Sequence, residues 1–223
     1  MRKERANSLM ALLIAVGIGT AFVMAHEGPD PAVHWIFDQK HIQGKVLHAR
    51  LGPDGTMNGR IQVIRDTFGE SVLFGGPNSG CTVAEGYRRL GAFVPEKEFT
   101  VSAWFSVDVS QRWGGIVGVF QDNGDAESGW VLGYNHDTFT FGLASQGTND
   151  GNGEMTYLSA KTRYQKGRLY QVEGEYDGTK MQLYVNGKLE GLSREQSGSI
   201  LYPSNAPVSY THLRAHETLR YLV

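Results

Sequence analysis

Hydrophobic and polar residues alternate strictly in several short segments of the chain. Within residues 99–107, five apolar positions are separated by Thr100, Ser102, Trp104 and Ser106. A period of two places the apolar side chains on one face of a β-strand. Residues 138–143 and 181–185 repeat the pattern, so the chain is predicted to be built from amphipathic strands.

Two dipeptides, Asp177-Gly178 and Asn186-Gly187, border the segment 181–185. They favour two-residue type I′ turns, in which both central residues need positive φ. Residues 171–193 are therefore predicted to form a three-stranded meander. No segment of the core shows helical periodicity, and further strands are expected near Val33–Phe37, Ser71–Phe74, Gly115–Gln121 and Gly129–Tyr134. This pattern predicts an all-β fold of two packed antiparallel sheets.

The composition agrees with this fold and excludes several classes of protein. The 223 residues include 29 glycines, while 20% are charged and 11% aromatic. This mixture excludes a disordered chain or a coiled coil, and the length suits one large β domain. A net charge of −2 without a basic cluster argues against nucleic acid as a partner. Cys81 is the only cysteine, so no intrachain disulfide forms.

The first 25 residues have the features of a secretory signal peptide. Arg2, Lys3 and Arg5 precede an apolar run over residues 9–23, and Ala25 ends a short segment suited to cleavage. The alternative is a retained membrane anchor, although this run is short for a span of about 20 residues. We expect a secreted or periplasmic protein that begins near His26 and has no membrane contact after cleavage.

The last 16 residues abandon the alternating pattern. Residues 208–218 read V-S-Y-T-H-L-R-A-H-E-T, which closely resembles a translated sequencing adapter. Residues 208–223 are therefore interpreted as a non-native tail, with a short C-terminal helix as the alternative. Residues 26–207 then form the domain, and we expect the natural protein to continue beyond Pro207, where a catalytic domain could lie.

Three segments resemble laminin G-like domains of the concanavalin A-like lectin/glucanase superfamily. Residues 34–38 read H-W-I-F-D like an opening strand, residues 99–105 match F-T-[IV]-S-A-W, and residues 176–187 match a Y-D-G-T…L-Y-V-[DN]-G hairpin. The resemblance implies a jelly-roll sandwich in which Trp35 and Trp104 are structural. One departure is Leu169–Val172, where the family usually has W-H-H-V.

Aromatic side chains are the candidates for binding a sugar, because their rings stack on the apolar faces of pyranoses. Trp113 stands at a strand entrance, and Trp130 and Tyr134 fall on one face of their strand. The full candidate set is Trp113, Trp130, Tyr134 and Tyr157. Core packing is the alternative for each of them.

Acidic residues suggest two further kinds of site. Glu173 and Glu175 alternate on one strand face, and retaining glycosidases use a carboxyl pair, although their E-x-D-x-x-E pattern is absent. The alternative is a solvated acidic face. Two acidic, glycine-rich loops offer oxygen ligands for calcium, as many domains of the resembled superfamily do; the candidate ligands are Asp122, Asp125, Glu127, Asp150, Asn152 and Glu154. Ordinary turn chemistry is the alternative there.

Two function classes follow. The first is a secreted, non-catalytic recognition module that binds an extracellular glycan or a glycosylated or other protein partner, with calcium as a candidate cofactor. It would be the N-terminal accessory domain of a larger exported protein. The second is a glycoside hydrolase or lyase that uses Glu173 and Glu175. The missing carboxylate motif favours the recognition module.

Overall fold

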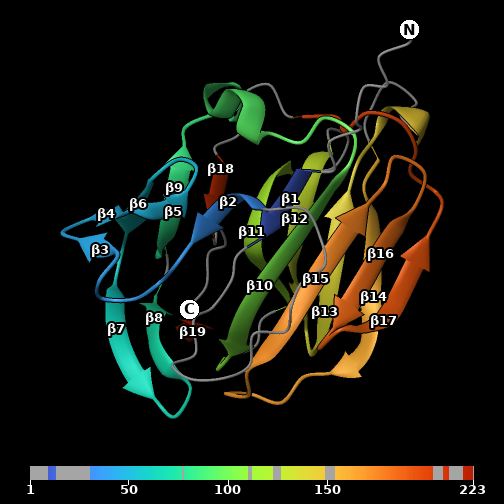
Figure 1. The fold of residues 1–223 in the computed structure, drawn as a ribbon. Coiled ribbons are helices and arrows are strands. Elements are labelled where there is room, and N and C mark those ends of the chain that lie inside the picture. The colour runs from blue at the N-terminus through green and yellow to red at the C-terminus, as the bar shows by residue number, and fades with distance from the viewer. Residues whose placement is uncertain are drawn as a thin grey trace, which may run out of the picture.

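The chain folds into two β-sheets that pack face to face (Figure 1). In this computed structural model the described residues are 10–13, 31–76, 78–109, 112–122, 127–148, 154–202, 208–210 and 218–222. The prediction of an all-β sandwich is confirmed. Two 3₁₀ segments, Tyr87–Phe93 and Gln146–Thr148, lie between strands.

Sheet 1 contains ten strands. Seven of them follow one another across the sheet: β17 (Lys188–Ser193), β16 (Met181–Val185), β15 (Tyr170–Tyr176), β10 (Phe99–Val107), β1 (Met10–Leu13), β2 (Pro31–Trp35) and β5 (Ala49–Leu51). Three more extend the sheet beside β10: β19 (Thr218–Leu222), β8 (Gly69–Gly75) and β7 (Ile61–Asp66). The pairings are antiparallel except those of β1, which runs parallel to β10 and β2.

Sheet 2 contains nine strands in antiparallel order. They are β14 (Thr156–Arg163), β13 (Thr138–Leu143), β12 (Ser128–Asn135), β11 (Trp113–Gln121), β18 (Val208–Tyr210), β9 (Gly80–Ala84), β6 (Gly55–Asn58), β4 (Val46–Leu47) and β3 (Ile42–Gln43). In Figure 1, β11, β12 and β13 form the layer behind β10 and β15.

Aromatic side chains fill the space between the sheets. Phe99 of β10 lies 4.8 Å from the ring of Trp130 and 5.9 Å from that of Phe141, which both belong to sheet 2. Phe105 meets Phe139 edge to face at 5.4 Å. Such contacts add to the burial that stabilises a fold without a disulfide. The five apolar positions of 99–107 all face this core, as their alternation predicts.

The predicted meander is confirmed, and one of its turns differs from the prediction. Asn186 and Gly187 both have positive φ, 49° and 74°, as a type I′ turn requires. The other connection has four residues, and only Gly178 has positive φ. There the Asp177 carboxylate accepts hydrogen bonds from the Thr179 and Lys180 amides. This turn is therefore held by the Asp177 side chain, and Asp177 itself does not adopt a left-handed backbone conformation.

One open edge of the sandwich is tied together by a buried carboxylate. Glu190 of β17 accepts hydrogen bonds of 2.7 Å from both the amide and the hydroxyl of Thr162 in β14. Because β14 ends sheet 2 and β17 ends sheet 1, this contact joins the two sheets at that side.

The two termini are described only in part. Within the predicted signal peptide only Met10–Leu13 is described, and its cleavage site near Ala25 lies outside the described residues. Within the tail, β18 pairs with β9 and β11, and β19 pairs with β8 and β10. No helix in the described part of the chain is long and apolar enough to cross a membrane.

Candidate functional site

The outer face of sheet 2, turned away from sheet 1, carries a patch of aromatic rings over glycine. The ring of Trp113 at the start of β11 lies 5.4 Å from the ring of Tyr157 in β14. Trp113 is 41% exposed, and Tyr157 is half-buried. Trp113 and Tyr157 therefore form a contiguous aromatic pair that a ligand can reach.

Three glycines on this face, Gly115, Gly133 and Gly142, form a glycine floor in the strands around the pair, and Gly142 lies beneath Tyr157. A Cβ on Gly142 would lie 2.7 Å from the Tyr157 ring, closer than real Cβ contacts. In the neighbouring strands Gly115 and Gly133 face each other across β11 and β12. Because Gly142 has no side chain, the Tyr157 ring can approach the backbone of β13 there, and the Trp113 ring lies beside it at an interplanar angle of 50°.

A small apolar cluster extends the floor toward one end of the strands. Val131, Ala144 and Met155 are buried there, and Phe120 and Tyr157 pack against them. This cluster is separate from the core between the sheets. Apolar residues therefore line part of the outer face of sheet 2 beneath Phe120 and Tyr157.

An acidic side chain, Asp122, fixes the Tyr157 hydroxyl at the same end of the strands. The Tyr157 hydroxyl donates a hydrogen bond of 2.5 Å to the Asp122 carboxylate. Burial raises the pKa of Tyr157, and the hydrogen bond and charge of Asp122 raise it further, so the phenol stays protonated. Glu127 accepts a hydrogen bond of 2.7 Å from the amide of Met155, the residue before β14.

These contacts bear on the expected calcium ligands. Asp122 and Glu127 already accept hydrogen bonds from the protein, and Asp125, Asp150 and Asn152 lie outside the described residues. In the described part of the chain no three candidate ligands gather. The described residues alone therefore do not supply the six to eight oxygens that calcium takes.

Two of the four predicted aromatic residues are not in this site. Trp130 is 3% exposed and Tyr134 is fully buried. They share one strand face, as predicted, but that face is the core side, which corrects the expectation that they stack on a ligand. The Trp130 indole donates its hydrogen bond to the Tyr202 hydroxyl at 3.2 Å.

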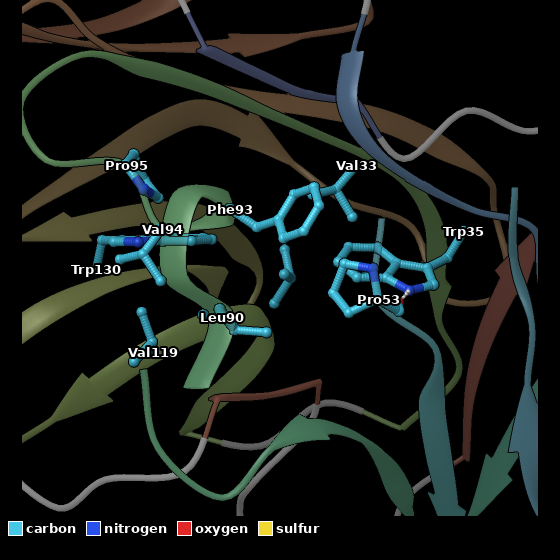
Figure 2. A pocket seen from close by; sticks show the side chains of 11 residues that line it. Val33, Trp35, Pro53, Leu90, Phe93, Val94, Pro95, Val119 and Trp130 are labelled. Carbon is cyan, nitrogen blue, oxygen red and sulfur yellow. Dashed lines mark hydrogen bonds between the residues drawn. The ribbon is translucent and has the colours of Figure 1, made fainter. Parts of the chain in front are cut away.

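Trp130 also lines an apolar pocket between the sheets, shown in Figure 2. Side chains from β2, from residues 90–95 and from β11 and β12 surround it. The second indole there, Trp35, donates its hydrogen bond to the Pro53 carbonyl at 2.7 Å. All side chains that the structure describes around the pocket are apolar, so they offer no polar group to orient a sugar.

The predicted acidic pair lies on the opposite side of the molecule. Glu173 and Glu175 are half-buried on the outer face of sheet 1, beside Tyr184 of β16. The Tyr184 hydroxyl lies 3.3 Å from a Glu175 carboxylate oxygen, to which it donates a hydrogen bond. Because the full thickness of the sandwich separates the two faces, these carboxylates cannot act on a ligand bound at Trp113 and Tyr157.

The sequence pattern did not point to Phe120 or to the glycine floor. A β-bulge between Gly115 and Val117 shifts the register against β12, so alternation counted through β11 loses its phase. The signal that could have found part of the floor is the pairing of Gly115 with Gly133 across β11 and β12.

Comparison with known proteins gives the class of this protein. Residues 75–210 match the family Laminin_G_3, described as the concanavalin A-like lectin/glucanases superfamily. That match spans more than half of the chain. The chain therefore belongs to this superfamily, as the sequence motifs indicated.

Individual proteins resemble the chain more distantly. It is 29% identical over 121 residues to human (Homo sapiens) pappalysin-1. The aligned region covers 49% of this chain and 7% of pappalysin-1. The binding domain of Paraclostridial Mosquitocidal Protein 1 superposes with a TM-score of 0.60 at 12% identity, over 81% of this chain and 45% of that one. The binding domain of botulinum neurotoxin DC, solved in complex with SialylT, superposes with a TM-score of 0.51 at 15% identity. The match covers 84% of this chain and 47% of that one. These structures share the fold.

Proposed function

We propose that the chain is a secreted recognition module that binds a carbohydrate on the outer face of sheet 2. The observation that carries this proposal is the contact between the exposed Trp113 and Tyr157, whose ring lies over Gly142. Pyranose rings have apolar faces, and exposed aromatic rings give them a flat partner with polar groups at the margin. Asp122 and Glu127 provide such polar groups at one end.

The similar proteins support the same assignment. Two toxin binding domains share the fold, and one of them was solved in complex with SialylT. The family match places the chain in a superfamily named for lectins and glucanases. A fold hosts many functions, so the site and not the fold carries the proposal.

The proposal keeps calcium as a ligand of the loops at residues 122–127 and 149–154. Glu127 accepts a hydrogen bond from the amide of Met155, the residue that follows the second of these segments. A metal that joins them would reduce the cost of ordering them when a glycan binds. Addition of EDTA would then weaken glycan binding, whereas an unchanged affinity would remove calcium from the proposal.

The test is a polysaccharide array probed with the purified chain and two matched tryptophan variants. We expect Trp113→Ala to abolish binding, because it removes half of the aromatic pair. Trp104→Ala, which changes the half-buried tryptophan on the outer face of sheet 1, is expected to leave binding within about twofold. Thermal unfolding of both variants checks that each remains folded.

Two results would overturn the proposal. One is equal binding by the wild type and Trp113→Ala. The other is release of new reducing ends that disappears in Glu173→Gln or Glu175→Gln, which would make sheet 1 the functional face.

A further inference from the structure

A buried glutamine is bonded to the residues at the start of β14. Gln196 is fully buried, although glutamine is mostly found at protein surfaces. Its side-chain oxygen accepts three hydrogen bonds of 2.7 Å, from the amide and the hydroxyl of Ser145 and from the hydroxyl of Thr148. Its side-chain nitrogen donates two hydrogen bonds of 3.0 Å, to the Glu154 carbonyl and the Thr156 hydroxyl. Both N–H groups and the oxygen of this amide are therefore engaged.

The two sides of the amide hold different parts of the chain. The oxygen holds residues that follow β13, and the nitrogen holds Glu154 and Thr156, which lie on either side of Met155. Thr156 is the first residue of β14, and Tyr157 comes directly after it. The amide is thus one residue away from the ring that contacts Trp113.

Gln196 is held in place by the chain that follows it. The Ile200 amide donates a hydrogen bond of 2.8 Å to the Glu96 carbonyl, and the Leu201 amide donates one of 3.0 Å to the Ala144 carbonyl. Glu96 precedes β10 of sheet 1, whereas Ala144 follows β13 of sheet 2. This segment therefore bonds to both sheets, and its glutamine offers β14 a fixed point of attachment.

We propose that Gln196 is a positioning residue of the binding site, because its amide fixes the start of β14 and so sets where Tyr157 stands against Trp113. This inference rests on the proposed function. Gln196 does not touch a bound glycan, since it is fully buried. Its effect on affinity passes through Thr156 to the Tyr157 ring.

Gln196→Glu in the full chain tests the two sides of the amide separately. The introduced carboxylate still accepts hydrogen bonds from Ser145 and Thr148, but it has no hydrogen to donate to the Glu154 carbonyl. We expect this variant to bind the polysaccharides of the array about three- to tenfold more weakly than the wild type at pH 8. In amide exchange measured by NMR, Met155 should exchange faster and Ser145 should keep its rate.

The loss of affinity should reverse in acid. A protonated carboxyl again has a hydrogen to donate, and a glutamate side chain takes up its proton at about pH 4.3 or, when buried, at a higher pH. The ratio of wild-type to variant affinity is therefore expected to fall to within about twofold as the pH is lowered from 8 to about 4.5. A role of Gln196 unrelated to hydrogen donation would leave this ratio unchanged, and that result would overturn the inference.

Thr162→Val is the matched control, because it removes a buried hydrogen bond near the other end of β14. The Thr162 hydroxyl donates a hydrogen bond of 2.7 Å to the buried Glu190 carboxylate. We expect this variant to lower Tm by about 2–4 °C and to keep glycan affinity within about twofold. Equal losses of affinity in Thr162→Val and Gln196→Glu would overturn the inference, because they would reflect general destabilisation of the strand.

The proposed function has its own test in Trp113→Ala, so the two failures can be told apart. Binding that is lost in Trp113→Ala but kept in Gln196→Glu at pH 8 leaves the site standing and overturns the inference. If no polysaccharide binds the wild type, the proposed function fails, and the exchange rate of the Met155 amide decides the positioning role. A faster rate in Gln196→Glu supports that role, and an unchanged rate overturns it.

Discussion

The outer faces of the two sheets are built from similar strands but carry different surfaces. On sheet 1 the positions of β15 and β16 carry long polar side chains, and Tyr184 stands within a hydrogen-bonded row with Gln182 and Glu175. On sheet 2 the corresponding area includes Gly115, Gly133 and Gly142; the Tyr157 ring lies over Gly142, and the Trp113 ring lies beside it.

This difference shows how a sheet gains a stacking surface. Where every position bears a side chain, the polar groups bond to one another and the surface stays hydrated. Where a glycine takes such a position, as at Gly142, a ring can approach the backbone, and the neighbouring Trp113 stays 41% exposed. The absence of side chains in the floor is therefore as important to the proposed site as the rings themselves.

The largest expected effect comes from filling the glycine floor. Gly142→Leu would place a side chain where the Tyr157 ring now lies, since even a Cβ would be 2.7 Å from that ring. We expect a loss of about 1–3 kcal/mol in the free energy of unfolding and a loss of glycan binding of more than about tenfold. Gly86→Ala is the control, because a Cβ there meets nothing within 4 Å. Chemical denaturation and titration with glycan measure both effects, and a binding-competent Gly142→Leu variant would refute the role of the floor.

A smaller effect is expected in the hairpin of sheet 1, and it changes stability alone. Partial burial on its own would raise the pKa of Asp177, but hydrogen bonds from Thr179 and Lys180 and the Lys180 charge hold it below its usual value. We expect Asp177→Ala to lower the free energy of unfolding by about 1–2 kcal/mol at pH 7 and to leave glycan affinity unchanged. The Thr179 and Lys180 amides would then lose the carboxylate that accepts their hydrogen bonds.

The pH dependence of that cost has a definite sign. A carboxyl with a lowered folded-state pKa stabilises the fold fully above its unfolded pKa of about 3.9. This contribution is lost as the pH falls through the folded-state pKa. The difference in unfolding free energy between wild type and Asp177→Ala should therefore narrow below about pH 4, as urea denaturation at several pH values would show. A difference that stays constant down to pH 2 would contradict this assignment.

Two tyrosine variants compare the faces atom for atom. Tyr157→Phe removes the hydrogen bond to Asp122 but keeps the ring, so we expect a decrease in glycan affinity of about three- to tenfold. Tyr184→Phe removes the equivalent hydroxyl bonded to Glu175 on sheet 1 and should leave affinity unchanged. Calorimetric titration of both variants provides the measurement, and equal losses would mean that the two faces do not differ as described.

The smallest expected effect is that of the acidic pair. Glu173→Gln and Glu175→Gln should leave glycan affinity within about twofold, because both residues lie on the face away from the aromatic pair. The same binding assay used for Trp113→Ala measures it. A loss comparable to that of Trp113→Ala would move the proposed site to sheet 1.

The sequence allowed the fold to be predicted well because its signals are local. The alternation in residues 99–107 and the Asn186-Gly187 turn both depend on neighbouring residues, and both are found as predicted. The aromatic site was predicted less well because periodicity shows which residues share a face, but not which face meets the other sheet. Trp130 and Tyr134 were grouped correctly and placed on the wrong side, whereas Trp113 and Tyr157 come together only through the pairing of four strands.

The most direct test of the central claim is to map a bound glycan onto the two faces by amide hydrogen exchange. The account predicts that saturating glycan slows exchange in β11 and β14, around Trp113, Phe120 and Tyr157, and leaves residues 171–175 and 182–184 of sheet 1 unchanged. Protection confined to those sheet 1 residues would contradict the claim that the glycine-floored face of sheet 2 is the binding site.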